Sequence, residues 1–202
     1  MSEVRSTRLQ RVFLQLSTLA VAASGIAYEL VIGTLGSYMH GDVTRHFAIS
    51  FGVFTAGLGM GAWLSAMLSS KLRQSLHLSS WGMLAWVELA LCIYGLALVR
   101  LCGALDMFSP WAEISFASAA GLGGVLVGLE LPVLVAMLGD FGGTMALDYV
   151  GALLASWAFP FVLMPWVGLD GTARAAGLAN GLVGIVCMYF ASMRVLPRER
   201  SS

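Results

Sequence analysis

Residues 24–38, SGIAYELVIGTLGSY, form an apolar stretch with a single acid, Glu29, in its interior. The stretch lies in a longer apolar window, about 12–38, which exceeds the roughly 20 helical residues needed to cross a hydrocarbon core of about 30 Å. A carboxylate at the centre of a spanning helix costs at least about 2.5–3.5 kcal/mol. The window therefore predicts a membrane helix in which Glu29 needs a physical explanation.

The rest of the chain has the same character. Hydrophobic residues make up 58% of the 202 residues and charged residues 11%, against roughly 45–50% and about 25% in soluble domains. Six windows are long and apolar enough to cross a membrane: about 12–38, 46–69, 79–101, 113–138, 146–168 and 173–194. Backbone groups in lipid must be hydrogen-bonded internally, so each window is predicted to be a helix. We expect one all-α membrane domain over residues 1–202.

The distribution of Lys and Arg predicts the orientation. In a six-span arrangement eight of the 11 basic residues fall on one side and three on the other: Arg5, Arg8, Arg11, Lys71, Arg73, Arg194, Arg198 and Arg200 against Arg45, Arg100 and Arg174. The richer side is expected to be cytoplasmic, and with it both termini. The apolar windows imply a lipid bilayer as the surroundings. The formal net charge is zero, which gives no reason to expect nucleic acid as a partner.

Small residues indicate where helices pack closely. Gly25, Glu29, Gly33 and Ser37 recur every four residues and so share one helix face, which we expect to contact protein, while Val21 is expected to face lipid. In the second window Gly57 and the glycine four residues later, Gly61, suggest another close helix contact.

Three more acids lie at membrane depth: Glu88, Glu130 and Asp148. None of the four has a Lys or Arg three or four residues away, so each acid is either neutral or meets a cation from elsewhere. A protonated acid that only fixes helix register is the structural alternative. The His and Cys residues show no ligand spacing, and we predict no metal, no cofactor and no catalytic residue.

An internal repeat is the second pattern. Residues 47–58, FAISFGVFTAGL, align with residues 145–156, MALDYVGALLAS, and a GD pair precedes each at the same offset. Three helices per copy is an odd number, so the second copy must insert upside down. We expect a 3+3 inverted repeat.

Four segments carry a family resemblance: YELVIGTLGSYMHGDVTRHFAISFGVFTAGLGMGAWLSA, WVELAL, GVLVGLELPVL and ALDYVGALLASWAFPFVLMPWVGL. Together they resemble the transporter-like membrane domain of bacterial membrane-bound spermidine synthase-like proteins. In that family the domain precedes a cytoplasmic aminopropyltransferase domain that uses decarboxylated S-adenosylmethionine. Because this chain ends at Ser202, we expect it to lack that domain and not to be an enzyme. The resemblance implies the inner membrane of a bacterium, and its likeness to half of a major-facilitator-type transporter implies that two copies could form a homodimer.

A polyamine carries several ammonium groups separated by methylenes, and a matching site needs spaced carboxylates between aromatic walls. The leading hypothesis is therefore a module that binds or translocates polyamine-like cations, with proton coupling. The alternatives are an anchor for a separately encoded aminopropyltransferase, with structural acids, and a membrane enzyme. The predicted binding residues are the acids Glu29, Glu88, Glu130 and Asp148, the aromatic residues Tyr28, Tyr38, Tyr149 and Trp86, and Asp42 and Asn180, which the resemblance adds.

Overall fold

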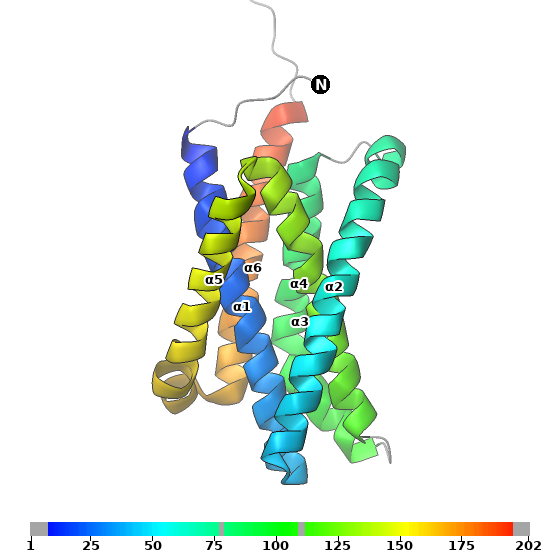
Figure 1. The fold of residues 1–202 in the computed structure, drawn as a ribbon, viewed down its shortest axis with the longest axis vertical. Helices are drawn as coiled ribbons and strands as arrows, with labels where there is room; N and C mark the ends of the chain where they lie inside the picture. Colours follow the sequence, from blue (N-terminus) through cyan, green and yellow to red (C-terminus); the bar gives the residue numbers. More distant parts are fainter. Residues whose placement is uncertain (1–7, 77–78, 109–111, 196–202) are drawn as a thin grey trace, which may run out of the picture.

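A computed structural model describes residues 8–76, 79–108 and 112–195, and all the regular structure in these ranges is helical. The elements are α1 (Arg8–His40), α2 (Val43–Leu76), α3 (Ser80–Phe108), α4 (Ala112–Leu138), α5 (Phe141–Ala158), the π-helix η1 (Phe159–Leu163) and α6 (Met164–Val195). Figure 1 shows them as a bundle of rods whose long axes run along the same direction. The all-α prediction is confirmed.

Five helical stretches in the described part of the chain are long and apolar enough to cross a membrane. Four of them correspond to the first four predicted windows. The fifth, Phe141–Met193, contains both of the last two windows, because α5, η1 and α6 follow one another without a break. Six separate spans and a 3+3 repeat are therefore not shown by the helix boundaries alone.

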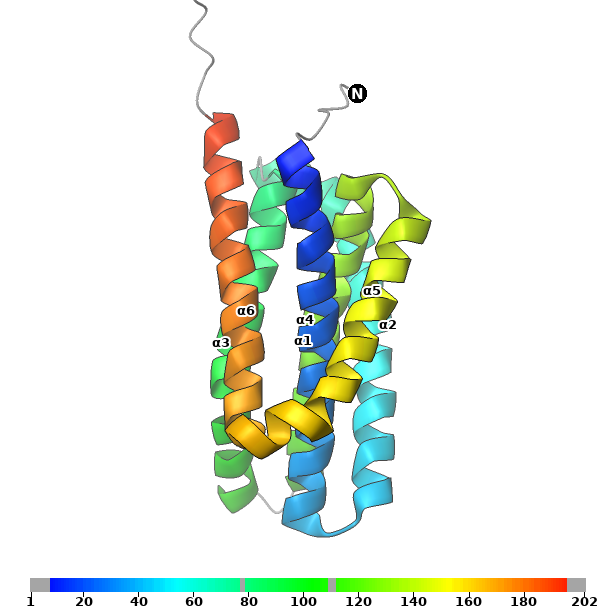
Figure 2. The ribbon, with the colours of Figure 1, turned by 90° about the vertical axis from the view of Figure 1, so that its left-hand side faces the viewer.

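The long final stretch nevertheless reverses direction, as Figure 2 shows. Pro160, at the start of η1, lacks a backbone N–H and interrupts the α-helical hydrogen bonding. Eight residues later Gly168 adopts φ 69° and ψ −174°, a conformation that only glycine reaches easily. These two residues turn the chain so that α6 runs back along the bundle.

Helix packing follows the glycine pattern of the sequence. On α2, a Cβ added at Gly57 would lie 2.6 Å from the carbonyl oxygen of Gly121 on α4, and one at Gly61 would meet the carbonyl oxygen of Val125. The predicted close contact through Gly57 and Gly61 is confirmed. On the other side, a Cβ at Gly95 of α3 would lie 2.7 Å from the carbonyl oxygen of Ala173 on α6, so α3 and α6 also pack closely.

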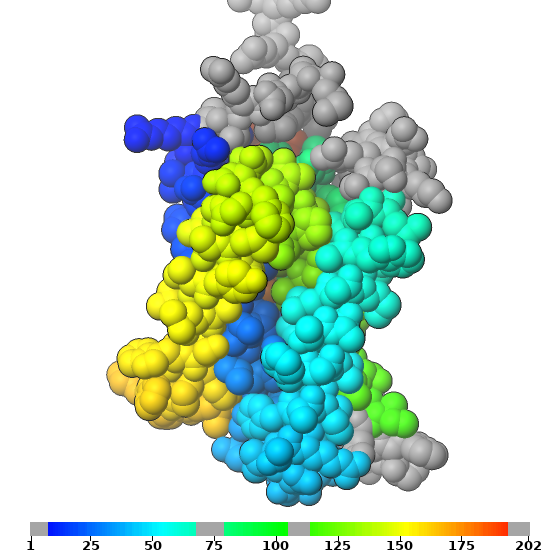
Figure 3. Space-filling model, in the orientation of Figure 1, coloured from blue at the N-terminus to red at the C-terminus, as the bar shows by residue number. Residues whose placement is uncertain are grey.

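Helix α1 lies among the others and contacts each of the five other α-helices. Gly25, Gly33 and Ser37 are buried, as the stripe predicted. The expectation that Val21 faces lipid is wrong, because α1 is covered on most sides and Val21 is buried as well. On one face of the molecule α1 remains visible between α5 and α2 (Figure 3).

Candidate functional site

Four of the predicted site residues meet inside the bundle. Tyr28 of α1, Glu88 of α3, Glu130 of α4 and Asn180 of α6 each have 0% of their surface exposed. Glu88 and Glu130 lie within electrostatic range of Tyr28 and of each other. We call these four residues the buried cluster.

A short hydrogen-bond chain orders one side of the cluster. Asn180 donates from Nδ2 to the Tyr28 hydroxyl over 3.1 Å, and the hydroxyl donates to the backbone oxygen of Leu91 over 3.2 Å. Since the tyrosine proton is used by Leu91, the asparagine must present its NH₂ group to the hydroxyl. This fixes the amide orientation and turns Oδ1 of Asn180 away from Tyr28.

Small residues explain how these side chains come together. A Cβ at Gly95 would lie 2.7 Å from the Tyr28 hydroxyl oxygen, so the absence of a side chain there makes room for the tyrosine. A Cβ at Gly184 would lie 3.1 Å from Cβ of Glu88. Asn180 and Gly184 are four residues apart on α6 and share a face. Glu88 therefore enters the bundle beside the face of α6 that carries Asn180.

The two acids of the cluster have no hydrogen-bond partner among the described residues. Both carboxyl oxygens of Glu88, both of Glu130 and Oδ1 of Asn180 are buried and unpaired. Buried polar groups normally have partners, and an unpaired one requires an explanation. Chemically, the cluster offers acceptor oxygens to a donor or a cation.

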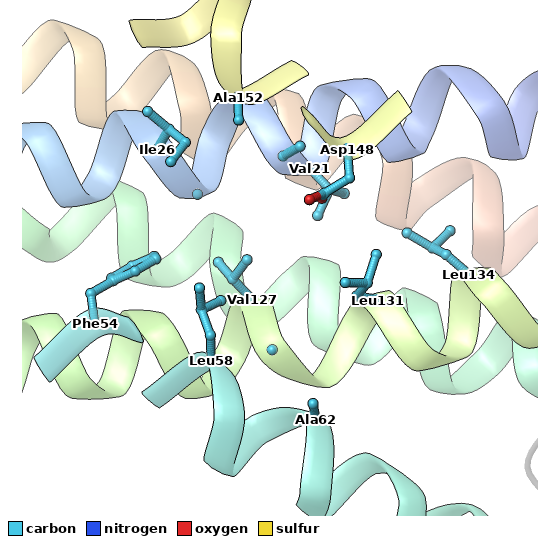
Figure 4. A pocket seen from close by; sticks show the side chains of 13 residues that line it. Val21, Ile26, Phe54, Leu58, Ala62, Val127, Leu131, Leu134, Asp148 and Ala152 are labelled. Carbon is cyan, nitrogen blue, oxygen red and sulfur yellow. The ribbon is translucent and has the colours of Figure 1, made fainter. Parts of the chain in front are cut away.

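Asp148 lies elsewhere, in a groove between α1, α2, α4 and α5. The cavity has a volume of about 150 Å³, and Asp148 is the one acid among the 13 residues that line it. Figure 4 shows its carboxylate among apolar side chains such as Val21, Leu131 and Leu134. Glu29 is half-buried and lies one turn beyond the groove residues Gly25 and Ile26 on α1. The four predicted acids thus occupy two different settings.

The other predicted residues do not join the cluster. Trp86, Tyr38 and Tyr149 are 67%, 69% and 71% exposed and lie on the outer surface of the protein. Asp42 is exposed and accepts a hydrogen bond from the backbone N–H of Arg45 at the start of α2. It acts there as a helix cap. Their roles in ligand binding stay predictions.

Sequence reasoning missed Tyr94. Its ring packs edge-to-face on Tyr28 with 5.2 Å between centroids, and its hydroxyl donates to the backbone oxygen of Ala119 on α4 over 2.8 Å. A Cβ at Gly123 would lie 2.5 Å from that hydroxyl. The sequence signal was a tyrosine in an apolar window, six residues after Glu88 and followed by glycine.

Comparison with known proteins identifies relatives over most of the chain. A protein of Leptospira interrogans named polyamine aminopropyltransferase is 33% identical over 178 residues, covering 83% of this chain and 33% of that protein. Polyamine aminopropyltransferase 2 of Ralstonia nicotianae is 31% identical, covering 87% of this chain and 35% of that protein. The polyamine aminopropyltransferase of Corynebacterium efficiens is 31% identical, covering 96% and 38%.

The chain therefore spans about a third of the length of the curated relatives it matches. No family model matches the sequence, and no solved structure matches it. The prediction of a module that binds or translocates polyamines is wrong, because the relatives are named as enzymes and no observation indicates transport. The alternative of an anchor for a separate enzyme gains no better support. At about 30% identity over most of its length, the chain is related to the polyamine aminopropyltransferases.

Proposed function

We propose that this chain takes part in polyamine aminopropyl transfer, as the membrane-spanning part of an enzyme related to the polyamine aminopropyltransferases. One observation carries the proposal: similarity to proteins of that name extends over 83–96% of the chain. The substrate class follows from the same name, and a polyamine is the proposed acceptor of the aminopropyl group.

The surface of the bundle supports a place in the membrane. Large apolar side chains point outward along its length, among them Trp63, Ile93, Leu153, Phe161 and Trp166. In water such a continuous apolar surface would drive aggregation, whereas in lipid it is the expected outer face. The proposed location is the inner membrane of a bacterium, as the family resemblance implies.

The orientation proposed has both ends of the bundle's chain in the cytoplasm. Helix α1 begins and α6 ends at the same end of the bundle (Figure 1). Arg8 and Arg11 lie at this end, and Arg45 follows the turn at the opposite end. A periplasmic reporter inserted after Gly41 should be active and one fused after Val195 inactive. The reverse pattern would contradict the orientation.

Six crossings and an inverted repeat are part of the proposal. If α1, α2 and α3 correspond to α4, α5 and α6, the contacts of one half should recur in the other. Helix α4 packs against α2 and α3, and α1 packs in the same way against α5 and α6. The reversal at Gly168 lets α5 and α6 cross separately, although they form one helical stretch. This correspondence of contacts supports a 3+3 arrangement.

The function is tested on the protein as the cell makes it. The tagged protein would be purified from native membranes and given isotope-labelled putrescine and decarboxylated S-adenosylmethionine, the donor implied by the family resemblance. We expect aminopropylated putrescine, detected by mass spectrometry, that depends on both reagents. A mock purification from cells lacking the gene is the control. Absence of product, together with an unchanged polyamine pool in those cells, would contradict the proposal.

A further inference from the structure

A second cavity lies at the end of the bundle where α1 begins. Its volume is about 240 Å³. Helix α1 contributes Arg11 and Gln15 to the lining, and the segment that joins α4 to α5 contributes Leu138, Asp140 and Leu147. Figures 1 and 2 show the turn between α4 and α5 at this same end of the bundle. We call this space the end cavity.

The backbone around the end cavity is well defined. Arg11 and Gln15 are four residues apart on α1 and share one face. Gly139 turns the chain with a φ of 68°, and Asp140 then caps α5 by accepting a hydrogen bond from the Gly143 N–H over 3.0 Å. This bond uses Oδ1, and within the described ranges Oδ2 of Asp140 accepts no hydrogen bond. One carboxylate oxygen therefore remains available to a donor.

The two charged residues of the lining, Arg11 and Asp140, have opposite signs. Both side chains are exposed. Neither forms an ion pair in the described part of the chain, so their charged groups lie more than 4 Å apart. The lining as a whole is formally neutral, yet it presents a cation and an anion at separate places. A molecule that carries an anion and a cation a few atoms apart matches this pattern.

The chemistry of the two side chains narrows the ligand. The planar guanidinium of Arg11 suits a phosphate, which it can bind through two N–H groups. The free carboxylate oxygen of Asp140 needs an N–H donor, which a primary ammonium group has and a quaternary one lacks. Leu138 and Leu147 add an apolar wall, and the outer surface of the bundle continues it. A phosphate, a primary ammonium group and apolar chains occur together in phosphatidylethanolamine.

We propose that the end cavity binds the headgroup of one phosphatidylethanolamine molecule, with the phosphate at Arg11 and the ammonium group at Asp140. The lipid would join α1 to the turn between α4 and α5. This inference goes beyond aminopropyl transfer and rests only on the membrane placement proposed above. A chain that transfers no aminopropyl group would still bind the lipid, so the two tests fail independently.

Native mass spectrometry of the purified protein in detergent tests the headgroup. Phosphatidylethanolamine, phosphatidylglycerol and phosphatidylcholine with the same acyl chains would be titrated separately. We expect the apparent Kd of phosphatidylethanolamine to be lower about tenfold or more, because the other two lack the N–H donors that Asp140 accepts from. Equal Kd values for the three lipids would overturn the proposal. Soluble glycerophosphoethanolamine that binds as tightly as the lipid would overturn the assignment to a lipid.

Asp140→Asn tests the ammonium contact without removing the helix cap, because Asn caps helices as well as Asp does. The variant should lose the preference for phosphatidylethanolamine over phosphatidylglycerol. Asp42→Asn is the matched control, since Asp42 caps α2 at the opposite end of the bundle by accepting from the Arg45 N–H over 3.0 Å. The control should keep all three Kd values. An unchanged preference in Asp140→Asn, or the same loss in Asp42→Asn, would contradict the proposal.

Arg11→Gln tests the phosphate contact and lies outside the cap. The variant should raise the apparent Kd of phosphatidylethanolamine and of phosphatidylglycerol about tenfold, because both lipids lose a charge-assisted hydrogen bond. If Asp140→Asn does not fold, this variant decides the question. Wild-type Kd values in Arg11→Gln would overturn the proposal.

Discussion

The buried cluster and the Asp148 groove share α1 and α4, but they enclose their acids to different degrees. On the α3–α6 side, glycines bring two backbones together and four polar side chains are enclosed without exposure. On the other side, α5 and α2 leave α1 visible between them, and a single carboxylate lies in an apolar groove (Figures 3 and 4). Four acids that look alike in the sequence therefore divide into an enclosed pair and a more open pair.

The difference shows that acids at membrane depth can lie in surroundings of different kinds. Glu88 and Glu130 depend on the groups around them, because no water or lipid headgroup reaches a fully enclosed side chain. Asp148 borders a cavity and is only half-buried, so its environment can adjust to it. Substitutions in the cluster should consequently cost more than substitutions at the groove.

The largest effect on stability is expected at Gly95, where α3 and α6 pack closely beside the buried cluster. A Cβ there would approach the carbonyl oxygen of Ala173 and the Tyr28 hydroxyl, each at 2.7 Å. Gly95→Leu should therefore lower the free energy of unfolding by about 3 kcal/mol or more, since overpacking forces backbones apart. Denaturant unfolding in detergent measures the change. Gly59→Leu is the control, because a Cβ at Gly59 meets nothing within 4 Å and should change stability by less than about 0.5 kcal/mol. Similar losses of stability in both variants would show that the close packing at Gly95 has no special weight.

A smaller loss is expected from Tyr28→Phe. The substitution deletes the hydroxyl that donates to Leu91 and leaves the Asn180 NH₂ group without its acceptor. A buried hydrogen bond lost in this way costs about 1–3 kcal/mol. Tyr149→Phe removes a hydroxyl from an exposed ring and should leave the unfolding midpoint unchanged. If both variants unfold like wild type, the hydrogen-bond chain contributes nothing to the stability of the bundle.

The smallest effect is expected at the groove. Asp148→Leu replaces the groove's acid by an apolar side chain that can extend into a cavity of about 150 Å³. Stability should stay the same or rise by up to about 1 kcal/mol, because apolar surface replaces a partly desolvated carboxylate. Asp148→Asn keeps the shape and is the control for the loss of charge. A loss above about 2 kcal/mol in Asp148→Leu, measured by the same unfolding assay, would place Asp148 in a polar network like that of the cluster.

The helical fold could be predicted because length and hydropathy decide whether a segment spans a membrane. The boundary between the last two windows could not, since Pro160 bends the helix without ending it and Gly168 turns the chain inside a continuous helical stretch. Close packing at Gly57 and Gly61 could be predicted, because a spacing of four residues places both on one helix face.

The four residues of the buried cluster could be singled out in the sequence, but their arrangement could not, and their roles in binding stay predictions. Successive residues on a helix point about 100° apart, so Trp86 faces outward two residues before the buried Glu88. Tyr149 likewise turns outward next to Asp148. Without the helix rotations, these aromatic residues looked like walls of one site. The predicted function was wrong for a related reason. Apolar helices that carry acids indicate a membrane protein, but they do not specify a reaction.

The hydrogen bond between Asn180 and Tyr28 joins residues that are 152 positions apart. A chain synthesised at about 5–20 residues per second needs roughly 8–30 s to produce Asn180 after Tyr28. In the course of that interval Glu88 and Glu130 are also made, while α6, the last helix of the cluster, is still missing. Completion of the polar interior therefore waits for the synthesis of α6. A ribosome that stalls before α6 leaves a nascent chain whose exposed acids distinguish it from the finished protein.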